Sequence, residues 1–159
     1  SSTLALVDPR PSDPDQRARQ ETVLRALATI PNLSIFYGFF LTHKVTMPRV
    51  GGGYAQVIKT EEKGSDVNLA TQLLVDAYHD DYEIAVVVSS DSDLLMPIQV
   101  VTREFKKPVG LLNPQKNPRH ALLPHVAFIK QIRSGVLAKS QFPKTLTDQR
   151  GSFSKPASW

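Results

Sequence analysis

The chain has 159 residues, a net charge of +4 and 41% apolar residues, enough for one domain with a buried core and too few for two full ones. It contains no cysteine, which excludes disulfides, thiolate metal sites and cysteine nucleophiles and fits a cytoplasmic location. No apolar run reaches the about 18 residues of a membrane-spanning helix, and the N-terminal residues lack the pattern of a signal peptide. We therefore expect no membrane partner.

The charges are unevenly distributed along the chain. Residues 1–100 contain 13 acidic and 8 basic side chains, whereas residues 101–159 contain 2 acidic and 11 basic ones. A metal-dependent enzyme that acts on a polyanion needs acidic side chains for the metal ion and basic side chains for the substrate. A basic segment that only aids solubility is the alternative, and charge alone does not separate the two.

The first part of the chain begins with an apolar run at 3–7 that predicts a strand. The proline-rich segment 8–15 predicts a loop, in which Asp13 or Asp15 is placed to cap the next helix. The apolar face of that helix is formed by Val23, Leu24, Leu27 and Ile30.

Two strands are then predicted. Segment 33–46 is rich in β-branched and aromatic residues, and segment 55–60 follows it after a glycine-rich turn, so the two fit a hairpin. Gly64 ends the second strand, and Ser65 is placed as the N-cap of a helix. The apolar positions of this helix are Val67, Leu69, Leu73, Leu74 and Ala77.

Segment 83–90 is almost entirely apolar, which is typical of a central parallel strand covered on both faces. A helix follows, with Pro97 tolerated near its first turns. A buried strand at 108–113, a short helix or turn at 118–126 and a last strand at 127–132 complete the pattern.

Alternation of strands and helices through 54–132 predicts a parallel α/β sheet. From residue 134 onward the apolar residues are sparse and show no helix or strand period. We therefore expect one domain over 1–133 and an extended C-terminal tail over 134–159, either wrapped on the domain or partly disordered.

Three acidic residues stand out as candidate ligands. Asp91 and Asp93 follow the apolar strand, and Asp66 lies in the first turn of the helix after the 55–60 strand. Parallel sheets place ligand sites at the carboxyl ends of their strands, where such carboxylates suit Mg²⁺ or Mn²⁺. The alternative is that Asp66 and Asp91 are helix caps, and spacing alone favours that alternative.

A resemblance strengthens the site hypothesis. Residues 63–69 read KGSDVNL, and residues 89–94 read SSDSDL with Pro97 shortly after. These paired motifs resemble the core of NYN domains, the LabA-like relatives of PIN-domain nucleases. The resemblance implies an α/β fold of PIN-like, three-layer type with a mostly parallel central sheet.

The same resemblance implies Mg²⁺- or Mn²⁺-dependent hydrolysis of RNA. Asp66, Asp91 and Asp93 match the metal-binding and catalytic carboxylates, Ser89 and Asn68 match supporting polar groups, and Lys63 matches a phosphate contact. The basic half supplies further candidate RNA contacts: Lys106, Lys107, Lys116, Arg119, Lys130 and Arg133.

The sequence departs from the family at its start. Family members open with a strand that ends in an aspartate, of the type xIDxxN, and this sequence contains no such segment. A sheet without its first strand leaves open edges, from which we expect a homodimer or strand exchange. The alternatives to an endoribonuclease are a catalytically impaired RNA-binding or regulatory module, a phosphatase of another class, and a structural domain whose aspartates are caps.

Overall fold

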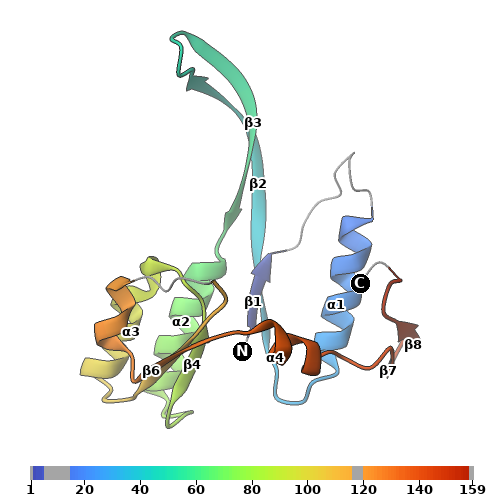
Figure 1. Cartoon of the computed structure of the whole chain (residues 1–159), viewed down its shortest axis with the longest axis vertical. Coiled ribbons are helices and arrows are strands. Elements are labelled where there is room, and N and C mark those ends of the chain that lie inside the picture. The colour runs from blue at the N-terminus through green and yellow to red at the C-terminus, as the bar shows by residue number, and fades with distance from the viewer. Residues whose placement is uncertain (1, 6–14, 116–119, 158–159) are drawn as a thin grey trace. The chain divides into compact units, whose positions relative to one another are not determined.

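The computed structural model describes residues 2–5, 15–115 and 120–157. The chain (Figure 1) divides into two compact units. Unit 1 contains residues Ser1–Asn68 and Lys144–Trp159, and unit 2 contains Leu69–Pro143. Both units contain strands and helices, which alternate in unit 2, and the α/β class is confirmed.

Unit 1 contains a mixed sheet of three strands. Strand β1 (Ser2–Ala5) runs parallel to β2 (Ile35–Pro48), and β2 pairs antiparallel with β3 (Tyr54–Lys63). The predicted hairpin is confirmed, and both strands extend beyond their predicted ends. Because β1 reaches only as far as Gly38, the rest of the hairpin is a two-stranded ribbon among the described strands.

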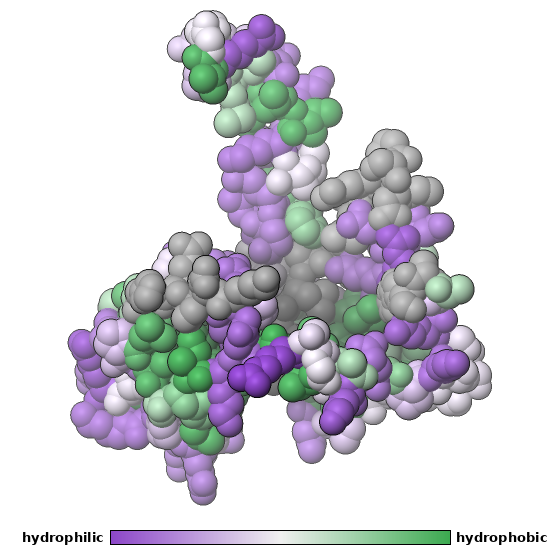
Figure 2. All heavy atoms as spheres, in the orientation of Figure 1, coloured by the Kyte–Doolittle hydropathy of each residue, from purple (hydrophilic) through white to green (hydrophobic). Residues whose placement is uncertain are grey.

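The β2–β3 ribbon exposes apolar side chains. The ribbon carries the labels β2 and β3 in Figure 1, and Figure 2 shows apolar surface along its distal part. On the two strands the most exposed apolar side chains are those of Phe39 (61%), Tyr54 (73%) and Ile58 (72%), and Val50 in the turn between the strands is fully exposed. A two-stranded hairpin is marginal by itself, so its base, where β1 pairs with it, is the better supported part.

Helix α1 (Gln16–Ala28) ends before Ile30, contrary to the predicted apolar face. Val23 and Ile30 are 37% and 40% exposed, and Ala26 is the residue of this helix that is buried. Asp15 occupies the N-cap position, but its side chain makes no cap hydrogen bond. Asp13 and most of the predicted 8–15 loop lie outside the described residues.

The C-terminal segment is more regular than its sequence pattern indicates. It forms α4 (Ser134–Lys139) and a hairpin of β7 (Thr145–Asp148) with β8 (Gly151–Ser154). The hairpin belongs to unit 1 and α4 to unit 2. Pairs such as Thr147–Ser152 hold the hairpin together by hydroxyl contacts, and hydrophobic patterning does not detect such contacts.

Unit 2 is built on a parallel sheet in the order β4-β5-β6. Its strands are β4 (Ala85–Val88), β5 (Val109–Asn113) and β6 (Phe128–Gln131). The connections contain the 3-10 turn η1 (Ser92–Leu94), helix α3 (Leu95–Arg103) and the 3-10 turn η2 (His120–His125). The three strands, helix α3 with Pro97 in its first turn and a short helix or turn at the place of η2 were predicted, whereas the residues of η1 were expected to be the start of the helix.

One apolar core organises unit 2. Its fully buried side chains come from α3, β5 and the adjoining turns: Leu94, Ile98, Val101, Val109, Leu111 and Leu122. Helix α2 (Ser65–Tyr78) adds Leu73 and Ala77, as its periodicity predicts. Burial of this kind contributes roughly 1.5–3 kcal/mol for each large apolar side chain.

The prediction that segment 83–90 is covered on both faces is wrong. Strand β4 lies at the edge of its sheet, where Val87 is buried but Val86 and Val88 are 50% and 56% exposed. The central strand is β5, and the ring of Phe128 on β6 covers its Gly110. An ideal Cβ at Gly110 would lie 2.1 Å from the Cζ atom of Phe128, so the ring occupies the space of a side chain.

The start of α2 also differs from expectation. Gly64 ends β3 with a φ of +93°, as predicted, but Ser65 is the first helical residue rather than the cap. The Ser65 amide donates to Oε1 of Glu62 at 3.1 Å. The Glu62 side chain therefore caps an amide at the start of α2, the role that was predicted for Ser65. Val67 is 68% exposed and does not join the core.

Among the described residues, no helix is long and apolar enough to cross a membrane.

Candidate functional site

The carboxyl ends of β4, β5 and β6 meet at one edge of the unit 2 sheet. The register pairs Val88 with Leu112, and Asn113 with Gln131. Asp91 follows β4 and Arg133 follows β6, so both residues come just after this edge, as the sequence predicts for parallel strands. Ligands bind at this edge in open parallel sheets, and it is therefore the candidate site.

Asp91 is fixed by two hydrogen bonds. Its amide donates to Oγ of Ser89 at 3.0 Å, and its Oδ1 accepts from the amide of Asp93 at 2.9 Å. Asp91 is therefore the N-cap of η1, as the cap alternative predicts. Capping uses Oδ1, and Oδ2 accepts no hydrogen bond within the described part of the chain. The Asp93 carboxylate is exposed on the first turn of η1.

The predicted residues around Asp66 lie in unit 1. Asp66 is exposed in the first turn of α2. The Asn68 side chain donates from Nδ2 to the Tyr37 carbonyl at 3.1 Å, which ties the start of α2 to β2. Nζ of Lys63 lies 3.6 Å from Oε2 of Glu61.

Glu61 lies between two lysines on β3. Oε1 of Glu61 lies 2.7 Å from Nζ of Lys59, and this hydrogen bond lowers the pKa of the Glu61 carboxyl. The lysine Lys63 lowers it further through its charge. This carboxylate is therefore engaged with cations of its own strand, and we do not assign it to the site.

The donor set fits a hard cation that keeps several waters. Within the described ranges, no group of three or more His, Cys, Asp or Glu side chains is gathered to hold a metal ion. Asp66 belongs to unit 1 and Asp91 and Asp93 to unit 2, so the three-carboxylate set stays a prediction. Mg²⁺ needs only one or two protein carboxylates when waters and substrate phosphates complete its shell. Asp91 Oδ2 and Asp93 offer that number on one turn.

The predicted RNA contacts differ in their surroundings. Lys106, Lys130 and Arg133 are exposed, and Lys130 lies 5.7 Å above the ring of Phe128. Lys116 and Arg119 lie outside the described residues. Three of the predicted RNA contacts on unit 2 are therefore open to a phosphate.

Lys107 stands apart because its ammonium is engaged within unit 2. Its side chain is 13% exposed and pairs with Asp80 and with the Tyr82 carbonyl. The pKa of Asp80 is lowered by this pair. Burial raises the pKa of Tyr82 to about 12, and its hydroxyl donates to the Leu73 carbonyl at 2.9 Å. A structural role therefore accounts for Lys107.

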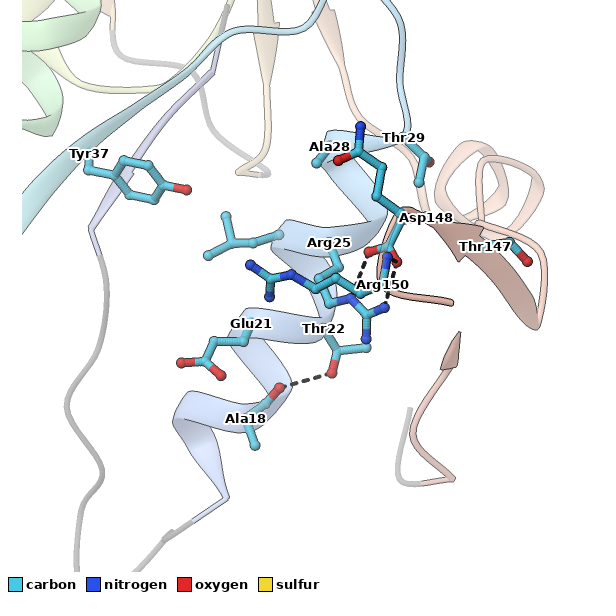
Figure 3. A pocket seen from close by; sticks show the side chains of 12 residues that line it. Ala18, Glu21, Thr22, Arg25, Ala28, Thr29, Tyr37, Thr147, Asp148 and Arg150 are labelled. Atoms are coloured by element: carbon cyan, nitrogen blue, oxygen red, sulfur yellow. Dashed lines mark hydrogen bonds and ion pairs between the residues drawn. The ribbon is translucent and has the colours of Figure 1, made fainter. Parts of the chain in front are cut away.

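A pocket of about 1010 Å³ lies in unit 1, and sequence reasoning did not anticipate it. Helix α1, Tyr37 of β2 and the turn of the β7–β8 hairpin form its walls (Figure 3). Its charged lining residues are Glu21, Arg25, Asp148 and Arg150. No sequence signal indicated it, because the hairpin residues follow α1 by more than a hundred positions and show no period.

Arg25 and Asp148 hold the pocket together. Nε and Nη2 of Arg25 each donate to one carboxylate oxygen of Asp148 at 2.8 Å. The guanidinium also lies 4.1 Å above the ring of Phe153 on β8. The paired hydrogen bonds lower the pKa of Asp148 to about 2.

Three comparisons bear on identity. The model of the NYN domain matches residues 16–130. The 6-hydroxy-3-succinoylpyridine 3-monooxygenase HspA of Pseudomonas putida is 32% identical over 109 residues, which are 65% of this chain but 35% of that protein. A crystal structure of a protein of unknown function, VPA0982 from Vibrio parahaemolyticus, has a TM-score of 0.53 at 14% identity, over 84% of this chain and 69% of that one. The last match concerns the fold alone.

Proposed function

This chain belongs to the NYN domain family, and from that membership we propose that it is a metal-dependent endoribonuclease that hydrolyses RNA phosphodiester bonds. The observation that carries the proposal is the carboxyl edge of the β4-β5-β6 sheet. There a fixed turn presents Asp91 and Asp93 at the edge from which Arg133 also emerges.

The roles of the residues follow from their contacts. Ser89 and the Oδ1 atom of Asp91 set the turn, while Oδ2 of Asp91 and the Asp93 carboxylate would hold the cation. Asp66 remains a candidate ligand by its place in the sequence motif. Mg²⁺ or Mn²⁺ bound there supplies a nucleophilic water and stabilises charge on the phosphate. Asn68 positions the first turn of α2, which carries Asp66.

RNA would approach over the basic surface of unit 2. Arg133 has a planar guanidinium that suits bidentate phosphate binding, and Lys106 and Lys130 are exposed point charges. Lys63, Lys116 and Arg119 remain candidate contacts by their place in the sequence. Lys107 is the weakest candidate, because an RNA phosphate would have to displace Asp80.

The second candidate is an RNA-binding module of the same fold without turnover. The cap geometry of Asp91 favours it, because a carboxylate that caps a turn already has a structural role. The monooxygenase activity in the name of the Pseudomonas relative is not carried over, since this chain spans 35% of that protein. The lack of cysteine supports a cytoplasmic location as part of the proposal.

The two candidates separate in one experiment. Labelled single-stranded RNA is incubated with the chain in Mn²⁺ or in EDTA, and both cleavage and binding are followed. The nuclease proposal predicts cleavage in Mn²⁺ alone. Salt-sensitive binding with no metal-dependent cleavage would instead support the binding module.

A further inference from the structure

Among the described residues that line the unit 1 pocket, Arg150 is a cation that the fold does not use. Arg25 is neutralised by Asp148, and Glu21 pairs with Nε of Arg17 at 3.1 Å. The Arg150 side chain makes no hydrogen bond or ion pair within the described part of the chain, and it acts on Asp148 only through its charge. Figure 3 shows it reaching away from the Asp148 carboxylate, toward the side of the pocket where Tyr37 lies.

An aromatic ring stands opposite this cation. Tyr37 is 52% exposed, and its hydroxyl makes no hydrogen bond among the described residues. Helix α1 lines the same pocket, and its Leu24, Ala28 and Ala18 provide apolar atoms. The pocket therefore offers a ring to stack on, an apolar wall and a free guanidinium. Its volume is at the upper end of the about 300–1,000 Å³ of small-ligand sites.

We propose that this pocket binds a nucleotide of single-stranded RNA, with the base against Tyr37 and the phosphate on Arg150. Stacking on an aromatic side chain suits any base, and a guanidinium matches the geometry of a phosphate. The Arg25–Asp148 pair has the role of positioning, because it fixes the hairpin turn that carries Arg150. The inference rests on the proposed action on RNA and adds a holding site to it.

The test is equilibrium binding of a fluorescein-labelled single-stranded RNA to the full chain in EDTA, where no cleavage occurs. Arg150→Gln is expected to weaken binding about tenfold, the value of a charge-assisted hydrogen bond. Tyr37→Val removes the ring and places a β-branched residue, which suits a strand, in β2, and a loss of roughly tenfold is expected. Tyr37→Phe should bind nearly as the wild type does, because the stacking face remains.

Arg49→Gln is the matched control. Arg49 is an exposed arginine in the β2–β3 turn, so the substitution removes the same charge outside the pocket. An equal loss in Arg49→Gln and Arg150→Gln would reduce the effect to net charge and overturn the inference. Wild-type affinity of Arg150→Gln in a chain that still cleaves RNA would also overturn it, leaving the nuclease proposal intact.

Cleavage by the wild type, measured in Mn²⁺, separates this inference from the proposed function. A chain that binds RNA through Arg150 but does not cleave it would support the pocket and refute the nuclease. A wild-type chain with no affinity for RNA would refute both.

Discussion

Arg25 and Asp148 are joined by two hydrogen bonds of 2.8 Å although 123 residues separate them. The pair connects α1 to the β7–β8 hairpin and so closes unit 1 between its two stretches of chain. The Arg150 amide adds a further hydrogen bond to Oδ1 of Asp148 at 2.8 Å. One carboxylate thus holds both the helix and its own turn.

The first prediction concerns pH and Asp148. The hydrogen bonds of Arg25 lower the pKa of Asp148 from its ordinary 3.8 to about 2. A carboxyl whose pKa is lower in the folded state stabilises the fold above its unfolded pKa and loses that contribution as pH falls. The stability difference between wild type and Asp148→Asn should therefore be full above about pH 4 and vanish toward pH 2.

Denaturation followed by circular dichroism at several pH values measures this difference. Arg25→Gln serves as the partner control, because it removes the same pair from the other side. A difference that stays constant between pH 4 and pH 2 would contradict the assignment.

The second prediction concerns the packing of Gly110. A methyl group there would lie 2.1 Å from the Phe128 ring, so Gly110→Ala should lower the free energy of unfolding by about 1–3 kcal/mol. Replacing Phe128 by Ala in the same chain should remove most of that additional cost, a coupling that a double-mutant cycle measures.

Gly135→Ala is the control for the second prediction. No atom of the described residues lies within 4 Å of a Cβ at Gly135, and its place in α4 favours alanine. Equal destabilisation by the two substitutions would show that the Phe128 contact does not matter.

Most elements were predictable because they are encoded locally. The β2–β3 hairpin, helix α3 with Pro97 and strand β5 all follow from patterns within a few residues. The exposure of Val86 and Val88 was not predictable from the sequence. An apolar run looks the same in a central strand and in a strand at the edge of a sheet. Burial depends on what packs against a strand, and composition alone does not give that.

The candidate site was predictable in part. Parallel strand order placed Asp91 at the carboxyl edge, and the structure adds that Asp91 is also a cap. Spacing could not separate these roles, because both require a carboxylate at the start of a turn. The unit 1 pocket was not predicted, for another reason. The elements that form its walls are joined by the long-range pair of Arg25 and Asp148, which a local sequence pattern does not show.

The third prediction separates phosphate contacts from structural cations. Arg133→Gln should weaken RNA binding and reduce the slope of log K against log salt by about 0.7, the value for one phosphate contact on a single strand. Lys107→Gln should leave that slope unchanged and lower thermal stability instead, because Lys107 pairs with Asp80 and Tyr82. A change of slope in Lys107→Gln alone would reverse the two roles.

The fourth prediction concerns association. Among the described strands β4 pairs with β5 alone, and its exposed valines border the open edge. We propose a homodimer through such edges, so the mass from light scattering should rise with concentration. Val86→Lys should shift the equilibrium toward monomer, whereas Val136→Lys, on exposed α4, should not. A monomer mass at every concentration would rule the dimer out.

The central claim is that Asp91 holds a metal ion that is needed for the hydrolysis of RNA. The substitution Asp91→Asn tests this claim most directly. Asparagine still caps η1 by accepting from the Asp93 amide, so the fold and the melting temperature should be retained while the charge is lost. The control is Asp81→Asn, an exposed carboxylate in the turn after α2. The measurement is the rate of single-stranded RNA cleavage in Mn²⁺. We predict a loss of about 100-fold or more in Asp91→Asn, because a bound ion stabilises the transition state by several kcal/mol, and no loss in Asp81→Asn. Equal rates in wild type and Asp91→Asn would contradict the claim.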